Sequence, residues 1–258
     1  MDVTPLLNTL RDRRMLPDPC IAVLLVGSAA RGWSNSGSDL DIYLISDRPW
    51  PGADSAAIAL PLDPPQVRSE SFYLDGRRWE LTYWQDRQVD QMLTKISWPE
   101  FDRDVAAGTV LVLREEAFLE RLASGVPLLG EQWLTGRRAE LDASAFRSLL
   151  ITRSLGAADD AVEDALGQLA GGDLHSAVIS ARIAFGHAVD ALLEERGQYG
   201  SYAPKWRARR FLAANPQALS FEEYWDMETM RGLDPAAPEK WIRKVLTRCQ
   251  DISLKVEI

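Results

Sequence analysis

The chain has few cysteines and no long apolar run, and these shortages exclude several classes of protein. Its only cysteines, Cys20 and Cys249, lie near opposite ends of 258 residues. They could pair only if the chain ends met in an oxidising compartment, so we expect two reduced thiols in a cytoplasmic protein. No apolar stretch approaches the ~20 residues of a membrane span, and the N-terminus lacks a signal-peptide core. We therefore expect no membrane association.

The chain also lacks an excess of positive charge. Its formal net charge is −9, whereas a general nucleic-acid binder normally has a basic face, so general nucleic-acid binding is not expected. An acidic surface favours a cationic small molecule as partner. Apolar residues make up 46% of the chain, which argues for a packed globular protein of one large or two ordinary domains.

Two apolar runs in the first fifth of the chain, 23–26 and 40–45, dominate the sequence. The first is β-branched and continuously apolar, as in a buried strand, and leads into the small-residue loop Gly27-Ser28-Ala29-Ala30. Small side chains and free backbone N–H groups in such a loop can cradle an anion such as phosphate. The sequence therefore predicts a strand, an anion-binding loop and a second strand.

The second strand brings two carboxylates to one face. Asp39 and Asp41 are two residues apart, so their Cα atoms should lie about 6.6 Å apart on the same side of the strand. Two buried carboxylates this close repel each other, and a divalent cation between them removes the conflict. Hard oxygen ligands of this kind suit Mg²⁺, which commonly shares its coordination with substrate phosphates. The alternative is a solvated strand end.

A third acid lies in a predicted hairpin. Asp75-Gly76 between two β-rich runs, 66–74 and 77–84, is a strong hairpin signal. Alternation in the second run puts Glu80 on the face opposite Trp79. Glu80 is either an outward acid on an edge strand or a functional carboxylate, and the pattern alone leaves both open.

The combination of Gly27-Ser28, Arg31 and Asp39-x-Asp41 resembles the signature of the nucleotidyltransferase superfamily related to DNA polymerase β. Within it, the pattern is most similar to the antibiotic-modifying branch, such as the kanamycin nucleotidyltransferases. The resemblance covers mainly residues 20–115. It implies an α+β protein, with an N-terminal nucleotidyltransferase fold of mixed β-sheet and flanking helices followed by a C-terminal α-helical bundle.

The resemblance also implies an activity. A protein of this kind transfers a nucleoside monophosphate from a nucleoside triphosphate to a hydroxyl group and releases pyrophosphate. Asp39, Asp41 and Glu80 would be catalytic metal ligands for two Mg²⁺ ions. The expected acceptor is a small molecule, such as an aminoglycoside or a related metabolite, and a homodimer would fit the branch although no residue indicates one.

The nucleotide side of the site is expected in the glycine loop. Gly27 and Ser28 would hold the β- and γ-phosphates, and Arg31 would neutralise part of their charge unless it forms a surface ion pair. Ser38 either contacts the same phosphates or caps a turn. We take ATP as the expected nucleotide, although no residue pattern reads base identity.

From residue 127 onward the sequence predicts only helices, over 142–169, 174–196, 206–214, 221–231 and from 238 to the end. A short strand is predicted over 109–113, near the end of the nucleotide domain. We accordingly place the domains at 1–125 and 126–258. The resemblance implies a catalytic carboxylate on a C-terminal helix, and Glu163, in the densest acidic cluster, is the candidate; a solvated helix face is the alternative.

Two further features of the helical half leave alternatives open. Arg182 and His187 have the spacing of the Arg-x4-6-His motif of HEPN ribonucleases, which would make the protein a toxin–antitoxin module that nucleotidylates a protein or RNA partner. A buried or capping histidine is the simpler explanation. Lys205, Arg207 and the neighbouring arginines form either a phosphate-binding patch or the start of a helix. A non-catalytic nucleotide-binding module is the third alternative.

Overall fold

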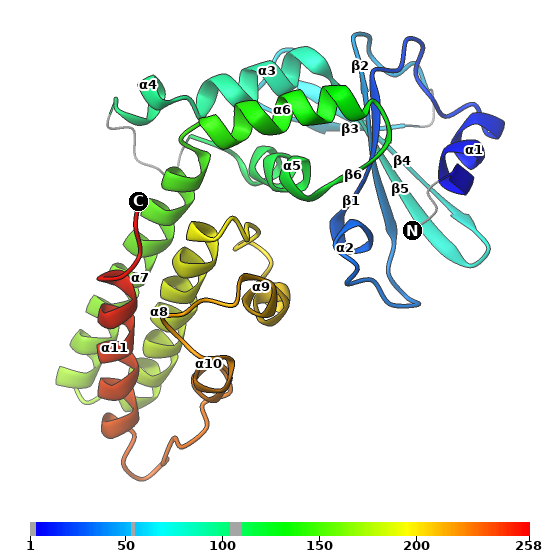
Figure 1. Cartoon of the computed structure of the whole chain (residues 1–258). Helices are drawn as coiled ribbons and strands as arrows, with labels where there is room; N and C mark the ends of the chain where they lie inside the picture. The colour runs from blue at the N-terminus through cyan, green and yellow to red at the C-terminus, as the bar shows by residue number, and fades with distance from the viewer. Residues whose placement is uncertain (1–3, 53–54, 104–109) are drawn as a thin grey trace. The chain divides into compact units, whose positions relative to one another are not determined.

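The computed structural model describes residues 4–52, 55–103 and 110–258. The chain separates into two compact units, Met1–Ala145 and Phe146–Ile258. The first holds a mixed six-stranded sheet with flanking helices, and the second is helical, which confirms the predicted α+β class (Figure 1). The predicted boundary at 125/126 falls earlier in the chain than the division between these units.

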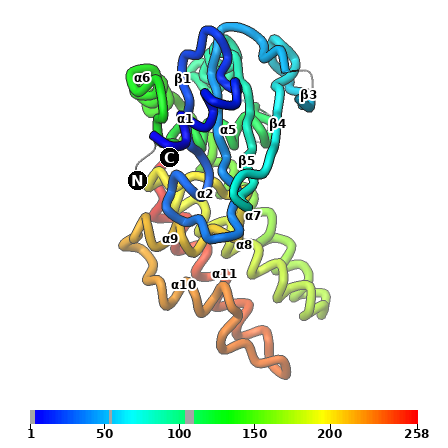
Figure 2. Tube along the Cα trace, turned by 90° about the vertical axis from the view of Figure 1, so that its right-hand side faces the viewer, coloured from blue at the N-terminus to red at the C-terminus, as the bar shows by residue number. Residues whose placement is uncertain are grey.

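The first unit is built on a sheet with the strand order β3-β4-β5-β2-β1-β6. Only the central pair, β2 and β5, is parallel; the other neighbouring strands are antiparallel. Figure 2 shows β3 and β4 at one side of this sheet. Its elements are α1 (Thr4–Asp12), β1 (Ala22–Val26), α2 (Gly27–Ala30), β2 (Leu40–Ser46), β3 (Ala56–Ala59), β4 (Gln66–Leu74), β5 (Arg77–Gln85), α3 (Asp86–Lys95), α4 (Trp98–Phe101), α5 (Leu113–Ser124), β6 (Val126–Leu129) and α6 (Glu131–Ala143).

Both faces of the sheet are covered, which explains the continuous apolar run of β1. On one face, Leu7 and Leu10 of α1 pack against alternate residues of the strands, including Ile42. On the other, Phe118 of α5 stacks on Tyr43 of β2, with ring centroids 5.4 Å apart. Figure 1 shows α1 on one side of the sheet and α3, α5 and α6 on the other. A strand buried on both faces needs no polar alternation.

The predicted hairpin is confirmed. β4 and β5 pair in antiparallel register through Leu74 and Arg77. Asp75 and Gly76 both have positive φ angles, 49° and 74°. A tight turn that matches the twist of the two strands requires positive φ angles at both central residues. Asp and Gly adopt such angles with little backbone strain.

Two strand predictions near the middle of the chain are wrong. Leu113 opens helix α5 instead of ending a strand, while Thr109, the start of the predicted strand, lies outside the described residues. Conversely, β6 follows residue 125 and pairs with β1, although the sequence predicts no strand there. Pro127 argues against a strand in general, but β6 is at the edge of the sheet, where a missing N–H is tolerated.

The second unit is a bundle whose helices follow the predicted segments closely. The helices α7, α8 and α11 run side by side in both ribbon views and share one apolar core (Figures 1 and 2). Its elements are α7 (Phe146–Ala170), α8 (Leu174–Glu195), the 3-10 turn η1 (Pro204–Trp206), α9 (Arg207–Ala214), α10 (Phe221–Glu228) and α11 (Glu239–Ser253).

Helix α8 is long and apolar enough, by length and composition, to pass as a membrane span, and it is the only such helix among the described residues. Most of its apolar window is buried inside the bundle. It also carries the buried charged side chains Asp190 and Glu194. The central helix of a bundle core can have the same length and apolar composition, so this finding is weak support for membrane insertion.

Candidate functional site

The three predicted carboxylates emerge from neighbouring central strands. Asp41 on β2 is the direct register partner of Glu80 on the parallel strand β5, and Asp39 immediately precedes β2. Because Leu40 and Ile42 point into the core beneath α1, the intervening Asp41 faces the opposite side of the sheet. The side chains of Asp39, Asp41 and Glu80 are 40%, 21% and 34% exposed. They are therefore accessible to a ligand while belonging to a rigid scaffold.

The glycine loop predicted after β1 is the short helix α2 in the structure, and its first residue, Gly27, lies against Asp41. Gly27 has a φ angle of +67°, and a Cβ atom added there would lie 2.5 Å from Oδ2 of Asp41. Val26 is the register partner of Asp41 on the adjacent antiparallel strand, which brings the loop to the carboxylate. Glycine is thus required at position 27 for two reasons, backbone conformation and the close approach of the carboxylate.

Asp41 is an electrostatically unsatisfied carboxylate. Burial is the main cause that raises its pKa, and the neighbouring charges of Asp39 and Glu120 raise it further. Arg121 and Arg78 act in the opposite direction without compensating fully. A carboxyl group in this position gains from a nearby cation, because the cation stabilises its ionised form.

Arg78, which the sequence analysis missed, connects the other two carboxylates. Its Nη2 lies 2.8 Å from Oε1 of Glu80, and its Nη1 lies 3.9 Å from Oδ2 of Asp39. The guanidinium therefore occupies a place between two acids that a metal ion would also favour. Arg78 and Glu80 are two residues apart on a strand and share a face, so this pair could have been found from the sequence.

Helix α5 supplies a second pair of charges that sequence reasoning missed. Arg121 lies 3.7 Å from Asp41, between Nη2 and Oδ1, and its Nη1 donates a 2.9 Å hydrogen bond to the hydroxyl oxygen of Tyr43. The preceding residue, Glu120, is buried and pairs with Arg31. Burial raises the pKa of Tyr43, so its phenol stays neutral. No local pattern links α5 to a loop about 90 residues earlier.

The predicted phosphate-binding residues have other contacts in this structure. Arg31 forms an ion pair with Glu120 and lies over the ring of Trp33, with Cζ 4.8 Å from the ring centroid. Ser38 closes a turn, because its hydroxyl oxygen accepts a 2.9 Å hydrogen bond from the backbone N–H of Asn35. Ser28 is half-buried at the start of α2. Phosphate binding by these residues remains a prediction.

The described residues contain no group of three or more His, Cys, Asp or Glu side chains arranged to hold a metal ion. Asp39, Asp41 and Glu80 are nevertheless hard oxygen donors on adjacent strands, and the arginines near Asp41 do not fully offset the rise in its pKa. The donor set thus fits Mg²⁺ chemically, while its present arrangement is held by arginines. Glu163 is exposed on α7 in the second unit, so the first unit alone does not supply it.

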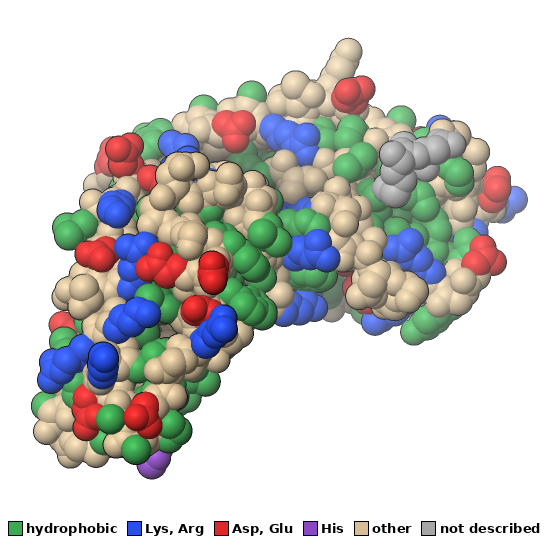
Figure 3. Space-filling view, turned by 60° about the horizontal axis from the view of Figure 1, so that its bottom comes forward, with side chains coloured by type: hydrophobic (Ala, Val, Ile, Leu, Met, Phe, Trp, Pro, Cys, Tyr) green, Lys and Arg blue, Asp and Glu red, His purple; other side chains and the backbone are tan. Residues whose placement is uncertain are grey.

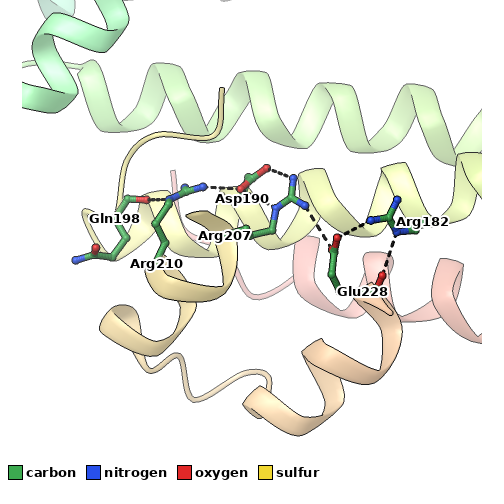
Figure 4. A network of polar contacts seen from close by, with 6 residues as sticks. All are labelled: Arg182, Asp190, Gln198, Arg207, Arg210 and Glu228. Atoms are coloured by element: carbon green, nitrogen blue, oxygen red, sulfur yellow. Dashed lines mark hydrogen bonds and ion pairs between the residues drawn. The ribbon is translucent and has the colours of Figure 1, made fainter. Parts of the chain in front are cut away.

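In the second unit, part of the predicted basic patch is a buried ion-pair network (Figure 4). Arg207 and Arg210 both bind the buried carboxylate of Asp190, at 2.8 Å and 2.7 Å. Glu228 connects Arg207 to Arg182, and Arg182 also donates to the backbone carbonyl of Glu228. The prediction of a continuous phosphate-binding patch is therefore wrong, because two of its four cations are buried and form ion pairs.

His187 is half-buried beside this network. Burial, the largest cause, lowers its pKa, and Arg207 and Arg153 act in the same direction against Asp190. A lowered pKa keeps the imidazole neutral among the packed helices. This agrees with the simpler explanation of His187 as a buried histidine. Arg182 is engaged with Glu228, so the described contacts do not pair it with His187.

The comparison with protein families found no family that matches the chain, and the comparison with curated proteins found no similar sequence. Among solved structures, the chain is similar to a nucleotidyltransferase-like protein from Exiguobacterium sibiricum. The two are 12% identical with a TM-score of 0.48, over 91% of this chain and 69% of that chain. So weak a similarity carries no argument about activity, which has to be argued from the residues.

Proposed function

We propose that this protein is a Mg²⁺-dependent nucleotidyltransferase that moves a nucleoside monophosphate from ATP to a hydroxyl of a small molecule. The observation that carries the proposal is the register of β2 and β5, which sets Asp41 beside Glu80 with Asp39 two residues from Asp41. The glycine loop lies against the same carboxylate. Carboxylates beside a phosphate-sized loop suit a reaction that depends on positioning and charge neutralisation.

Each residue of the site has a defined task in this proposal. Asp39 and Asp41 would hold the cation, and Glu80 would serve as a further ligand if Arg78 turned away. When bound, Mg²⁺ neutralises phosphate charge and favours the deprotonated acceptor hydroxyl. Gly27 keeps the loop close to Asp41, and Ser28 donates to a phosphate oxygen.

Arg31 can act on the triphosphate only by exchanging one anionic partner for another. Its guanidinium is paired with Glu120, so a phosphate group would replace that carboxylate. Such an exchange keeps the arginine neutralised and requires only movement of the side chain. In the same proposal, Glu163 remains the candidate base from the helical unit, and the acidic net charge favours a cationic acceptor such as an aminoglycoside.

The proposal is tested by binding and turnover together. Binding of ATP is measured with and without Mg²⁺, and pyrophosphate release is measured against a panel of aminoglycosides and hydroxylated metabolites. Asp41→Asn is compared with Asp47→Asn, which changes an exposed carboxylate just beyond the other end of β2. We expect Mg²⁺-dependent ATP binding and acceptor-dependent release in the wild type and in Asp47→Asn, and loss of both in Asp41→Asn.

Two results would contradict the proposal. ATP binding that is independent of Mg²⁺ and unaffected by Asp41→Asn would point to a non-catalytic nucleotide-binding module. Mg²⁺-dependent binding with label transfer from ATP only onto protein or RNA would replace the small-molecule acceptor by a macromolecular one.

A further inference from the structure

A shallow polar hollow lies on the helical unit, between α10 and α11. Its volume is about 440 Å³, which falls within the range of small-molecule sites. One face of α11 provides most of its lining, with Lys240, Arg243, Lys244, Thr247 and Arg248 at helical spacing. Figure 3 shows Lys and Arg side chains interspersed with Asp and Glu side chains on the surface of the helical unit. All of its lining residues belong to the second unit.

Both acids of this hollow are engaged by a single arginine. Nε of Arg248 lies 2.9 Å from Oε1 of Glu223, and its Nη2 donates a 3.1 Å hydrogen bond to Oε2. The same guanidinium lies 3.6 Å from Asp251. These contacts hold Arg248 in place beside both acids, whose side chains remain 40% and 50% exposed.

The three remaining cations have no such partner. Lys240, Arg243 and Lys244 are exposed, and none of them has an ion-pair or hydrogen-bond partner in the part of the chain that the structure describes. With Arg248 they make four positive charges against two negative ones, so the lining carries a net charge of about +2 on a chain whose net charge is −9.

Local helix stability does not account for these cations. Lys240 and Lys244 are four residues apart, where like charges repel by about 0.2–0.5 kcal/mol. Lys240 also lies in the first turn of α11, where the helix dipole favours acids over bases. An anion in the hollow would turn both unfavourable contributions into favourable ones.

We propose that this hollow binds a small molecule carrying two or three linked phosphate groups. Lys240, Arg243 and Lys244 bind the phosphates, the exposed Thr247 hydroxyl donates to a phosphate oxygen, and Met227 offers an apolar contact for the rest of the molecule. These three cations span about 6 Å, a little over one turn of helix, which matches a short phosphate chain better than an extended nucleic acid. The inference does not depend on nucleotidyl transfer in the first unit.

The experiment measures binding of inorganic tripolyphosphate to the full chain by calorimetry, at fixed ionic strength and with a chelator present. The chelator removes metal-dependent binding at the carboxylate site, so the two sites are distinguished. The pocket variant combines Lys240→Gln, Arg243→Gln and Lys244→Gln. The control variant combines Arg147→Gln, Arg209→Gln and Lys255→Gln, which removes the same charge from exposed positions of the same unit.

We expect the wild type and the control variant to bind tripolyphosphate equally, and the pocket variant to bind about tenfold more weakly or worse. If the triple variant unfolds, the single variant Lys244→Gln replaces it in the binding measurement. We expect it to bind tripolyphosphate several-fold more weakly than the wild type. Equal affinity in all variants, or no binding at millimolar tripolyphosphate, would overturn the proposal. So would pocket-dependent binding of an RNA oligonucleotide that tripolyphosphate does not displace.

Discussion

The carboxyl group of Glu194 should make the stability of this protein depend on pH in an unusual direction. Glu194 is fully buried on α8, and neither of its oxygens has a hydrogen-bond partner of ordinary geometry among the described residues. Burial is the main cause that raises its pKa from 4.5 to about 7, and Asp190 adds to it. Arg210 on α9 and the hydroxyls of Ser154 on α7 and Ser201 act in the opposite direction.

The magnitude follows from this difference in pKa. One pKa unit corresponds to about 1.4 kcal/mol, so ionised Glu194 is about 3 kcal/mol less favourable in the folded protein than in the unfolded chain. Because the folded pKa is the higher one, the folded protein binds more protons between pH 4.5 and about 7. Stability from this group is complete below pH 4.5, declines as the pH rises through that window, and is lost above about 7.

The assay compares urea unfolding of the wild type and Glu194→Gln from pH 5 to pH 8.5, followed by circular dichroism. The neutral amide removes the ionisation, so Glu194→Gln should be more stable than wild type by about 1–3 kcal/mol at pH 8, with the difference shrinking towards pH 5. Glu163→Gln, which changes an exposed acid on α7, should show no such trend. A difference that is the same at pH 5 and pH 8 would refute the reasoning.

Two further predictions concern the local geometry of each unit. Gly27→Ala places a Cβ against Asp41 at a positive φ angle, so it should lower the unfolding free energy in urea by about 1–3 kcal/mol. It should also weaken Mg²⁺-dependent ATP binding. Unchanged binding would show that the loop does not position the carboxylate. Asp190→Asn leaves two buried guanidinium groups without their shared anion and should cost about 3–5 kcal/mol of unfolding free energy, and a loss below 1 kcal/mol would contradict a structural role for this network.

The parts of this fold that follow local rules could be predicted from the sequence. Asp-Gly flanked by β-rich runs specifies the hairpin, and the period of two residues places Leu40 and Asp41 on opposite faces of β2. The edge strand β6 could not be predicted, because Pro127 weakens its pattern and only pairing with β1 makes it a strand.

The candidate site was predictable only where its residues are close in sequence. Asp39 and Asp41 could be proposed from their spacing, whereas Glu80 needed the family resemblance, and Arg121 reaches Asp41 from a helix that no local signal connects to β2. The burial of charged side chains could not be predicted from the sequence either. Arg207 and Arg210 resemble a surface patch because Asp190, which neutralises both, lies on another helix. Ion-pair partners across a fold are set by tertiary packing, whereas local patterns report only on neighbours along the chain.

The arginines around the carboxylates suggest how ligands would enter in the proposed reaction. Arg121 lies beside Asp41, and Arg78 bridges Asp39 and Glu80, so the chain itself partly neutralises all three acids. Exposed ion pairs of this kind contribute only about 0–1 kcal/mol, but the positive charge of the arginines lowers the electrostatic gain of a free divalent ion. A triphosphate changes the balance, because its negative charges attract both the arginines and the metal. In the proposed reaction, the site would therefore accept a metal–nucleotide complex in preference to the free ion.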